Sequence, residues 1–248
     1  MDRWVGKTAV VTGASAGIGA AIAVSLAKAG MTVVGLARRE KEIQDLNDQV
    51  NSAGSIIGMH CDLRNTEDMS TTFHDIEEKF GGADVLVNNA GMHISGHITD
   101  VGDEPLSDTD VLSILDLNLK SVILSTRLAV ASMKRREVDG HIVIINSVAG
   151  HYEPFAPTFN IYPTTKHGIT CFGKALLNEF AHFDNKIKVT SVSPGLVSTE
   201  LTAAVLDQHA LPALQPADVA DAVLYAISTP PNVIIRELTI GHVAEKLL

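Results

Sequence analysis

Cysteine is scarce in this sequence, which has only Cys61 and Cys171 among 248 residues. Two thiols are too few for a disulfide framework or a four-thiolate zinc site. We therefore expect both to be small apolar core residues of a protein in a reducing compartment. His93 and His97 have the spacing of some metal ligands, but Gly96 stands between them and the sequence offers no evident third ligand, so no metal is expected.

Positive charge is scarce as well. Lysine and arginine number 19 against 29 acidic residues, so the formal net charge is −10 at pH 7. Nucleic acids and anionic membranes select basic surfaces, and we expect neither as a partner. The segment from Met1 to Lys7 lacks the basic and then apolar layout of a signal peptide. We therefore expect a cytoplasmic protein.

One uncharged run, from Thr8 to Ala27, is long enough to resemble a membrane span. It contains Gly13, Gly17 and Gly19 between two apolar runs of different period, a pattern typical of a strand, a turn and a helix. We therefore expect no membrane span.

Hydrophobic residues make up 46% of the chain, enough to exclude disorder and to form a large core. Short apolar runs alternate with longer segments of helical period, as in repeated βαβ units around a parallel sheet. We predict a doubly wound, seven-stranded parallel sheet of the Rossmann type, in a single domain that spans residues 1–248. The strands are expected at 8–12, 32–36, 56–61, 85–87, 141–145, 188–192 and 237–240. The helices are expected near 18–29, 40–53, 66–80, 108–136, 163–183 and 216–228.

The turn after the first strand carries three glycines, Gly13, Gly17 and Gly19, in the spacing G-x-x-x-G-x-G. Glycines let the backbone turn sharply and approach a pyrophosphate, and the following helix offers unpaired N–H groups and the positive end of its dipole. A tight turn without a ligand is the alternative. The position directly after the first strand favours dinucleotide binding.

The end of the second strand bears on which dinucleotide is bound. A carboxylate there pairs with a free ribose 2′-hydroxyl, but here Ala37 is followed by Arg38 and Arg39. Arginine holds a phosphate through paired charge-assisted hydrogen bonds, so these residues favour NADP(H) over NAD(H). A solvated basic pair that opens a helix is the alternative. Asp62, after the third strand, is placed either to meet the adenine or to cap the next helix.

A phenol and an ammonium stand four residues apart at Tyr162 and Lys166, which places them on one face of a helix. A phenol has a pKa near 10, and a neighbouring cation together with the nicotinamide charge would lower it towards neutrality. Such a pair often arises by chance. However, Ser147 follows the fifth strand, and the carboxyl ends of parallel strands face the ligand crevice, so we expect Ser147 and Tyr162 to converge there.

Further polar motifs follow the fourth and sixth strands. Asn89, Ala90 and Gly91 end the sequence N-N-A-G after the fourth strand, and Asn118 lies in the next helix. The loop that begins at Pro194 follows the sixth strand and is expected to border the nicotinamide.

In this order, the motifs T-G-x-x-x-G-x-G, N-N-A-G, helical Asn, Ser, Y-x-x-x-K and P-G resemble those of the short-chain dehydrogenase/reductase family in its single-domain form. The resemblance covers the chain from Thr8 to Gly241. More narrowly, the opening Arg-Trp-x-Gly-Lys, the segment Met133-Lys134-Arg135 and residues 224–230 resemble the farnesol dehydrogenase-like proteins of insects and their vertebrate relatives.

The resemblance implies a catalytic set of Asn118, Ser147, Tyr162 and Lys166. Tyr162 would exchange a proton with the substrate oxygen, Ser147 would orient that oxygen, and Lys166 would hold the nicotinamide ribose and lower the pKa of Tyr162. Asn118 would bend its helix and hold a water that links Lys166 to solvent. The residues expected at NADP are Gly13, Ser15, Gly17, Ile18, Gly19, Arg38, Arg39, Asp62, Leu63, Asn89, Ala90, Gly91, Tyr162, Lys166, Pro194, Gly195, Val197 and Thr199.

The resemblance also places a substrate lid at about 200–215, and its shortness predicts an open pocket. His93, His151, Phe155 and Leu196 are expected to contact a small lipophilic substrate; otherwise the histidines are ordinary loop residues and the apolar side chains fill the core. The predicted helices at 108–136 and 163–183 carry more apolar residues than one sheet face needs. The resemblance implies that such helices pair across a two-fold axis, which predicts a homodimer or homotetramer; a fully intramolecular core is the alternative.

We therefore predict an NADP(H)-dependent oxidoreductase that transfers a hydride between nicotinamide and a lipophilic alcohol or ketone, such as farnesol or another terpenoid. A hydroxysteroid dehydrogenase or broad carbonyl reductase is the alternative within this class. An epimerase or dehydratase would need a longer C-terminal substrate region. A dinucleotide-binding protein without activity is disfavoured because Ser147, Tyr162 and Lys166 are all present.

Overall fold

Seven parallel strands form one sheet in the order β3-β2-β1-β4-β5-β6-β7, which confirms the predicted doubly wound fold. The computed structural model describes residues 1–152, 157–208 and 211–245. The strands are β1 (Thr8–Thr12), β2 (Thr32–Ala37), β3 (Ser55–His60), β4 (Val85–Asn88), β5 (His141–Ile145), β6 (Lys188–Pro194) and β7 (Glu237–Ile240).

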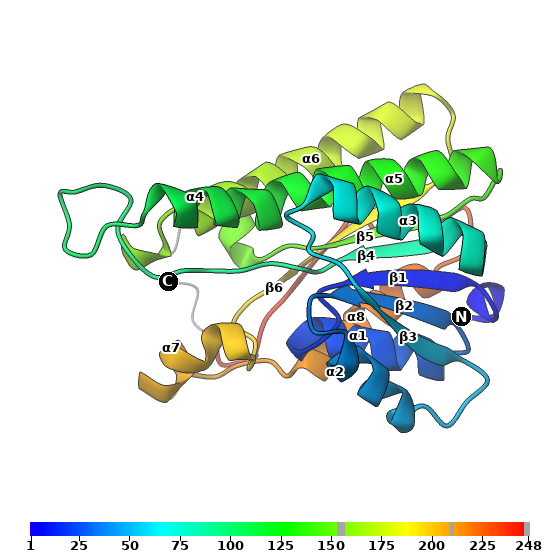
Figure 1. Cartoon of the computed structure of the whole chain (residues 1–248), viewed down its shortest axis with the longest axis horizontal. Helices are drawn as coiled ribbons and strands as arrows, with labels where there is room; N and C mark the ends of the chain where they lie inside the picture. The colour runs from blue at the N-terminus through cyan, green and yellow to red at the C-terminus, as the bar shows by residue number, and fades with distance from the viewer. Residues whose placement is uncertain (153–156, 209–210, 246–248) are drawn as a thin grey trace.

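Helices cover both faces of the sheet (Figure 1). One layer consists of α1 (Gly17–Lys28), α2 (Glu40–Asp45) and α8 (Pro216–Ser228). The other consists of α3 (Thr66–Phe80), α4 (Asp108–Leu115), α5 (Ser121–Arg135) and α6 (Tyr162–His182). The shorter helical turns are η1 (Asp2–Trp4), η2 (Leu46–Gln49), η3 (Asp116–Lys120), η4 (Val148–Gly150), η5 (Pro157–Phe159), η6 (Glu200–Thr202) and α7 (Ala203–Gln208). No helix in the described ranges has the length and apolar character needed to cross a bilayer.

The apolar strands divide the core into two layers. Successive side chains of a strand point to opposite faces, so Val11 packs in the layer of Ile22 of α1 and Val10 in the layer of Met69 of α3. Because both faces of β1 are buried, its central residues Ala9, Val10 and Val11 are apolar without alternation, as in other parallel sheets covered on both sides.

Two predicted helices are interrupted in the structure. The helix predicted at 40–53 ends as α2 at Asp45 and continues only as the 3-10 turn η2. There the Asn47 side chain accepts a hydrogen bond from the backbone N of Ile56 at 2.8 Å, and this competes with further helix. The helix predicted at 108–136 is divided into α4 and α5 by the π-helical turn η3. Such turns are frequent at functional sites.

The two cysteines have different environments. Cys61 is buried, and burial raises the pKa of its thiol to about 11, so it is the inert core residue that was predicted. Cys171 is exposed on α6, which corrects the prediction of a second core thiol. It stands two residues after the buried Ile169, and two helical steps of 100° turn a side chain to the opposite face.

The strand order reverses between β1 and β4. From β1 the chain moves outward through β2 to β3, and from β4 it moves outward through β5 and β6 to β7. Ligands of open parallel sheets bind at the carboxyl ends of the strands at such a switch point. The edge beyond β1 and β4 is therefore where a functional site is expected.

Candidate active site

The turn between β1 and α1 has a shape that only glycine permits. Gly13 and Gly17 have positive φ angles of 67° and 55°, which other residues rarely adopt. A Cβ at Gly19 would lie 2.2 Å from the carbonyl oxygen of Gly13. Ala16, the N-cap of α1, makes no side-chain capping bond. The backbone can therefore approach an anion at the start of α1, and this cradle fits a pyrophosphate.

The motif after β4 holds this turn in place. The Asn89 side chain donates hydrogen bonds to the carbonyl oxygens of Thr12 at 2.9 Å and Gly13 at 3.2 Å. In return, the hydroxyl of Thr12 accepts the backbone N–H groups of Asn89 and Ala90 at 2.9 and 3.1 Å. These hydrogen bonds join the ends of β1 and β4 through Asn89. The predicted contact of Asn89 with the cofactor stays a prediction.

The remaining residues predicted at the cofactor follow strands at the same edge. They are Ser15 and Ile18 around the start of α1, Leu63 after β3, Ala90 and Gly91 after β4, and Pro194, Gly195, Val197 and Thr199 at and after the end of β6. Thr199 lies against the glycine turn, since a Cβ at Gly17 would be 3.3 Å from its Cγ2.

Two exposed arginines follow β2, as predicted from the sequence. Arg38 and Arg39 begin the connection to α2, and the buried Ala37 ends β2 where a carboxylate would bind a free ribose hydroxyl. Arg39 Nη2 lies 3.5 Å from Glu200 Oε2 at the start of η6. This pair joins the cofactor side of the crevice to the segment predicted as the substrate lid.

Asp62 has an arginine partner that the sequence argument did not anticipate. Arg64 donates to its carboxylate from Nε at 3.1 Å and from Nη2 at 2.8 Å, and this pairing lowers the pKa of Asp62 to about 2. The alternative that Asp62 caps the next helix is wrong, because the N-cap of α3 is Asn65. Asp62 is thus an ionised carboxylate at the end of β3.

The predicted reactive side chains converge beyond β5. Ser147 stands two residues after the end of β5, and Tyr162 is the first residue of α6. Their side chains are hydrogen-bonded. Lys166 lies one helical turn after Tyr162, with Nζ 5.6 Å from the centre of the phenol ring. The ammonium donates to the carbonyl oxygen of Ile145 at 3.1 Å, which ties α6 to the end of β5.

Burial has the largest effect on the pKa of Tyr162 in the folded chain. Burial raises it above its ordinary value, and the hydrogen bond with Ser147 only partly opposes this effect. Burial also lowers the pKa of Lys166 to about 8, because an ammonium is disfavoured away from water. The protein alone therefore keeps the phenol protonated at neutral pH, and a lowered pKa requires further positive charge in the site.

Asn118 lies at the centre of the π turn η3 and is buried. Its side-chain oxygen accepts the backbone N of Met92 at 2.8 Å, and its amide donates to the Met92 oxygen at 2.8 Å and to Thr165 Oγ1 at 3.3 Å. It thus joins the loop after β4 to the first turn of α6, one residue before Lys166. Its predicted role in a water-mediated proton relay stays a prediction.

Among the residues predicted at the substrate, His93 lies beside the reactive phenol. Its ring centre is 5.8 Å from that of Tyr162 in an edge-on arrangement and 5.2 Å from that of Phe159, so an aromatic wall borders Tyr162. His151 instead contacts β6 and β7, with Nε2 3.0 Å from Ser193 Oγ and 3.3 Å from Glu237 Oε1. Phe155 lies outside the described residues.

The fourth predicted residue, Leu196, is held by the C-terminal segment. Its backbone N donates to Glu245 Oε1 at 3.0 Å, and the other oxygen of this carboxylate accepts the N–H of His242 at 3.3 Å. A Cβ at Gly195 would lie 2.1 Å from Glu245 Oε2, so a side chain there would displace this carboxylate. Glu245 was not predicted, because no local motif in the sequence marks a contact across 49 residues.

A phosphate cradle at the switch point, with serine, tyrosine and lysine beyond the neighbouring strand, defines a dinucleotide-dependent oxidoreductase. Residues 7–210 match the family model described as short chain dehydrogenase. The chain belongs to this family.

Its relatives agree with this assignment. Over 257 residues it is 44% identical to the farnesol dehydrogenase of Aedes aegypti, with 99% of this chain and 100% of that protein covered. It is 36% identical to dehydrogenase/reductase SDR family member 11 of Mus musculus, with 96% and 95% covered. A solved structure of a variant of actinorhodin polyketide ketoreductase with NADPH has a TM-score of 0.82 at 29% identity, with 96% of each chain covered. The narrower resemblance to insect and vertebrate proteins is confirmed.

Proposed function

We propose that this protein is an NADP(H)-dependent dehydrogenase or reductase for lipophilic alcohols and ketones, with an isoprenoid alcohol such as farnesol as the leading substrate. The main observation in favour of NADP(H) over NAD(H) is that Arg38 and Arg39 follow the buried alanine at the end of β2. Two guanidiniums suit a 2′-phosphate, and no carboxylate stands at Ala37 to bind a free hydroxyl. The NADPH-bound polyketide ketoreductase of similar fold supports this choice.

The residues at the switch point fit a dinucleotide. The glycine turn that a Cβ would fill is suited to hold the pyrophosphate, and Arg38 and Arg39 are suited to hold the 2′-phosphate. Lys166 and the loop that begins at Pro194 lie where the nicotinamide half would bind. When bound, the nicotinamide accepts or supplies the hydride of the reaction.

The chain's own residues handle the proton and the orientation of the substrate. During oxidation the phenolate of Tyr162 accepts the proton of the alcohol, and during reduction the phenol of Tyr162 donates its proton to the carbonyl oxygen. Ser147, which is hydrogen-bonded to Tyr162, holds and polarises the same oxygen. Lys166, 5.6 Å from the phenol ring, favours the phenolate through its positive charge. Asn118 fixes the first turn of α6 by its bond to Thr165.

A lipophilic substrate suits the side chains around Tyr162. His93 and Phe159 provide flat rings beside the phenol, and the half-buried Leu196 lies on the loop after β6. A short lid at about 200–215 would leave this pocket open to alcohols of different length. The name of the Aedes aegypti relative, farnesol dehydrogenase, supports an isoprenoid alcohol. The name of the mouse relative points to no substrate. A hydroxysteroid dehydrogenase or broad carbonyl reductase is the alternative.

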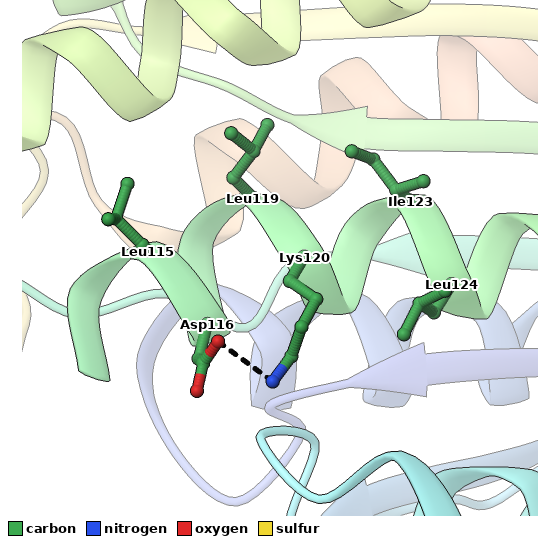
Figure 2. Close-up of a pocket in the computed structure, with 6 residues that line it drawn as sticks. All are labelled: Leu115, Asp116, Leu119, Lys120, Ile123 and Leu124. Carbon is green, nitrogen blue, oxygen red and sulfur yellow. Dashed lines mark ion pairs between the residues drawn. The ribbon is translucent and has the colours of Figure 1, made fainter. Parts of the chain in front are cut away.

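We also propose a homodimer or homotetramer in the cytoplasm. Leu115, Leu119 and Ile123 point to the same side of the helix that runs from α4 through η3 to α5 (Figure 2). With Leu124 and the ion pair of Asp116 and Lys120, they line a shallow groove of about 260 Å³. A stripe of this kind can pack on its own copy across a two-fold axis. The free thiols suit a reducing compartment.

The cofactor proposal is tested by changing Arg38→Asp together with Arg39→Ser. We expect the Kd for NADP⁺ to rise by a factor of about 100 or more, because two charge-assisted contacts are lost and a negative charge is added. The Kd for NAD⁺ should stay within about threefold, since that nucleotide lacks the 2′-phosphate. Equal affinity of the unmutated protein for both nucleotides would contradict the proposal.

A further inference from the structure

The ion pair of Arg39 and Glu200 joins two segments that are 161 residues apart in sequence. Arg39 follows β2 on the adenosine side of the crevice, and Glu200 begins η6 after β6. The two side chains are 50% and 75% exposed, and the single contact of 3.5 Å is long for an ion pair. A pair of this kind contributes little to folding stability. It does occupy a guanidinium that an anionic ligand could otherwise bind.

The backbone around Glu200 has a defined position over the glycine turn. Thr199 lies against Gly17, whose Cβ would be 3.3 Å from the threonine methyl group. The backbone N of Thr199 donates to the hydroxyl of Thr202 at 3.1 Å, and these two residues form a capping box for η6. The carboxylate of Glu200 therefore comes from a fixed turn at the cofactor crevice and reaches the arginine that follows β2.

We propose that Glu200 is a specificity-determining residue that weakens the binding of NADP(H) by competing with the 2′-phosphate for Arg39. This inference rests on the cofactor proposed above. A phosphate dianion and a carboxylate seek the same guanidinium donors, and they repel each other when both are close to it. A nucleotide without the 2′-phosphate leaves the ion pair undisturbed. Glu200 thus lowers the preference for NADP(H) that Arg38 and Arg39 create.

The test measures nucleotide affinity directly and does not depend on turnover. The Kd values of NADP⁺, NAD⁺ and 2′,5′-ADP are measured by titration calorimetry for the unmutated protein and for Glu200→Gln. Glutamine keeps the size of the side chain and removes its charge. We expect Glu200→Gln to lower the Kd of NADP⁺ and of 2′,5′-ADP by about two- to fivefold, the scale of an exposed ion pair. The Kd of NAD⁺ should not change.

Two further variants separate competition for Arg39 from a general charge effect. Glu42→Gln removes one negative charge from the exposed side of α2, close to the arginines in sequence, and should change no Kd. In the background of Arg39→Gln, the effect of Glu200→Gln should largely disappear, as in a double-mutant cycle of two coupled residues. Persistence of the full effect in this background would overturn the competition.

The remaining outcomes are distinguishable. Glu200→Gln would overturn the inference if it shifted the Kd of NAD⁺ as much as that of NADP⁺, or shifted neither. Equal binding of NAD⁺ and NADP⁺ by the unmutated protein would instead contradict the proposed cofactor, and the inference would fall with it.

Discussion

Burial and hydrogen bonding act in opposite directions on the phenol of Tyr162. From their spacing, the sequence identified this residue and Lys166 and predicted that positive charge lowers the pKa of the phenol, but it could not weigh the opposing direction set by burial. That direction depends on how much water the folded protein removes, and burial raises the pKa of Tyr162 while Ser147 opposes the rise. The same holds for Asp62, whose partner Arg64 is two residues away but pairs with it only because of the local turn.

Replacement of Lys166 tests the electrostatic part of the site. Lys166→Met removes a cation 5.6 Å from the phenol ring, so the phenolate loses its stabilisation. We expect kcat for alcohol oxidation at pH 7 to fall by a factor of about 100 or more, and the rising limb of the pH profile to move to higher pH. The measurement is the pH dependence of kcat. An unchanged profile would show that the charge does not act on Tyr162.

At the scale of elements, the pattern of apolar runs predicted the sheet well. The predicted bounds of β1, β5 and β7 equal those of the structure, as do those of α3 and α8. These elements have uniform period and clear signals at their ends, such as Asn65 at the N-cap of α3. The π turn around Asn118 was not predictable as such, because it depends on bonds to Met92 and Thr165 that form only in the folded protein.

The hydrogen bonds of Glu245, which connect the C-terminal segment to the loop after β6, can be tested by substitution. Glu245→Ala removes the acceptor of the Leu196 and His242 N–H groups. We expect KM for the alcohol to rise about tenfold, the loss that one charge-assisted hydrogen bond implies, with a smaller effect on the Kd of NADP⁺. Glu245→Gln keeps an acceptor oxygen and should give an intermediate KM. Steady-state kinetics provides the measurement, and identical KM values in all three proteins would contradict the assigned role.

At the scale of the whole molecule, a buried histidine couples stability to pH. His141 is fully buried in β5, and burial, together with the charges of Lys188 and Arg3, lowers its pKa to about 3. The unfolded chain binds a proton near pH 6.5, so the neutral side chain stabilises the fold above that pH. This contribution is lost progressively as the pH falls from about 6.5 to about 3, with a slope of up to about 1.4 kcal/mol per pH unit.

Acid denaturation of a variant checks this linkage. His141→Gln removes the titrating group but retains a polar side chain near Thr190, the partner of His141 at 2.8 Å. We expect the variant to be less stable at pH 7 and to lose less of its unfolding free energy than the unmutated protein between pH 6.5 and 4. Urea titrations at several pH values measure this. Parallel loss in both proteins would show that His141 does not control acid sensitivity.

The proposed assembly is tested on the helix face of Figure 2. Leu119→Asp places a charge at the middle of the apolar stripe, where burial of an unpaired carboxylate would be unfavourable. We expect sedimentation to give a smaller species for this variant than for the unmutated protein. Arg127→Asp, an exposed change further along α5, serves as a control for an added negative charge. A monomeric unmutated protein would contradict the proposed oligomer.

The most direct test of the account follows reduced-nicotinamide absorbance with NADP⁺ and a panel of alcohols: farnesol, a linear monoterpenol and a hydroxysteroid. We expect turnover with an isoprenoid alcohol, and a loss of about 100- to 10,000-fold in Tyr162→Phe, because that variant lacks the group that exchanges the proton. Its Kd for NADP⁺ should be nearly unchanged. Turnover of the hydroxysteroid alone would contradict the isoprenoid substrate, and full activity of Tyr162→Phe would contradict the mechanism.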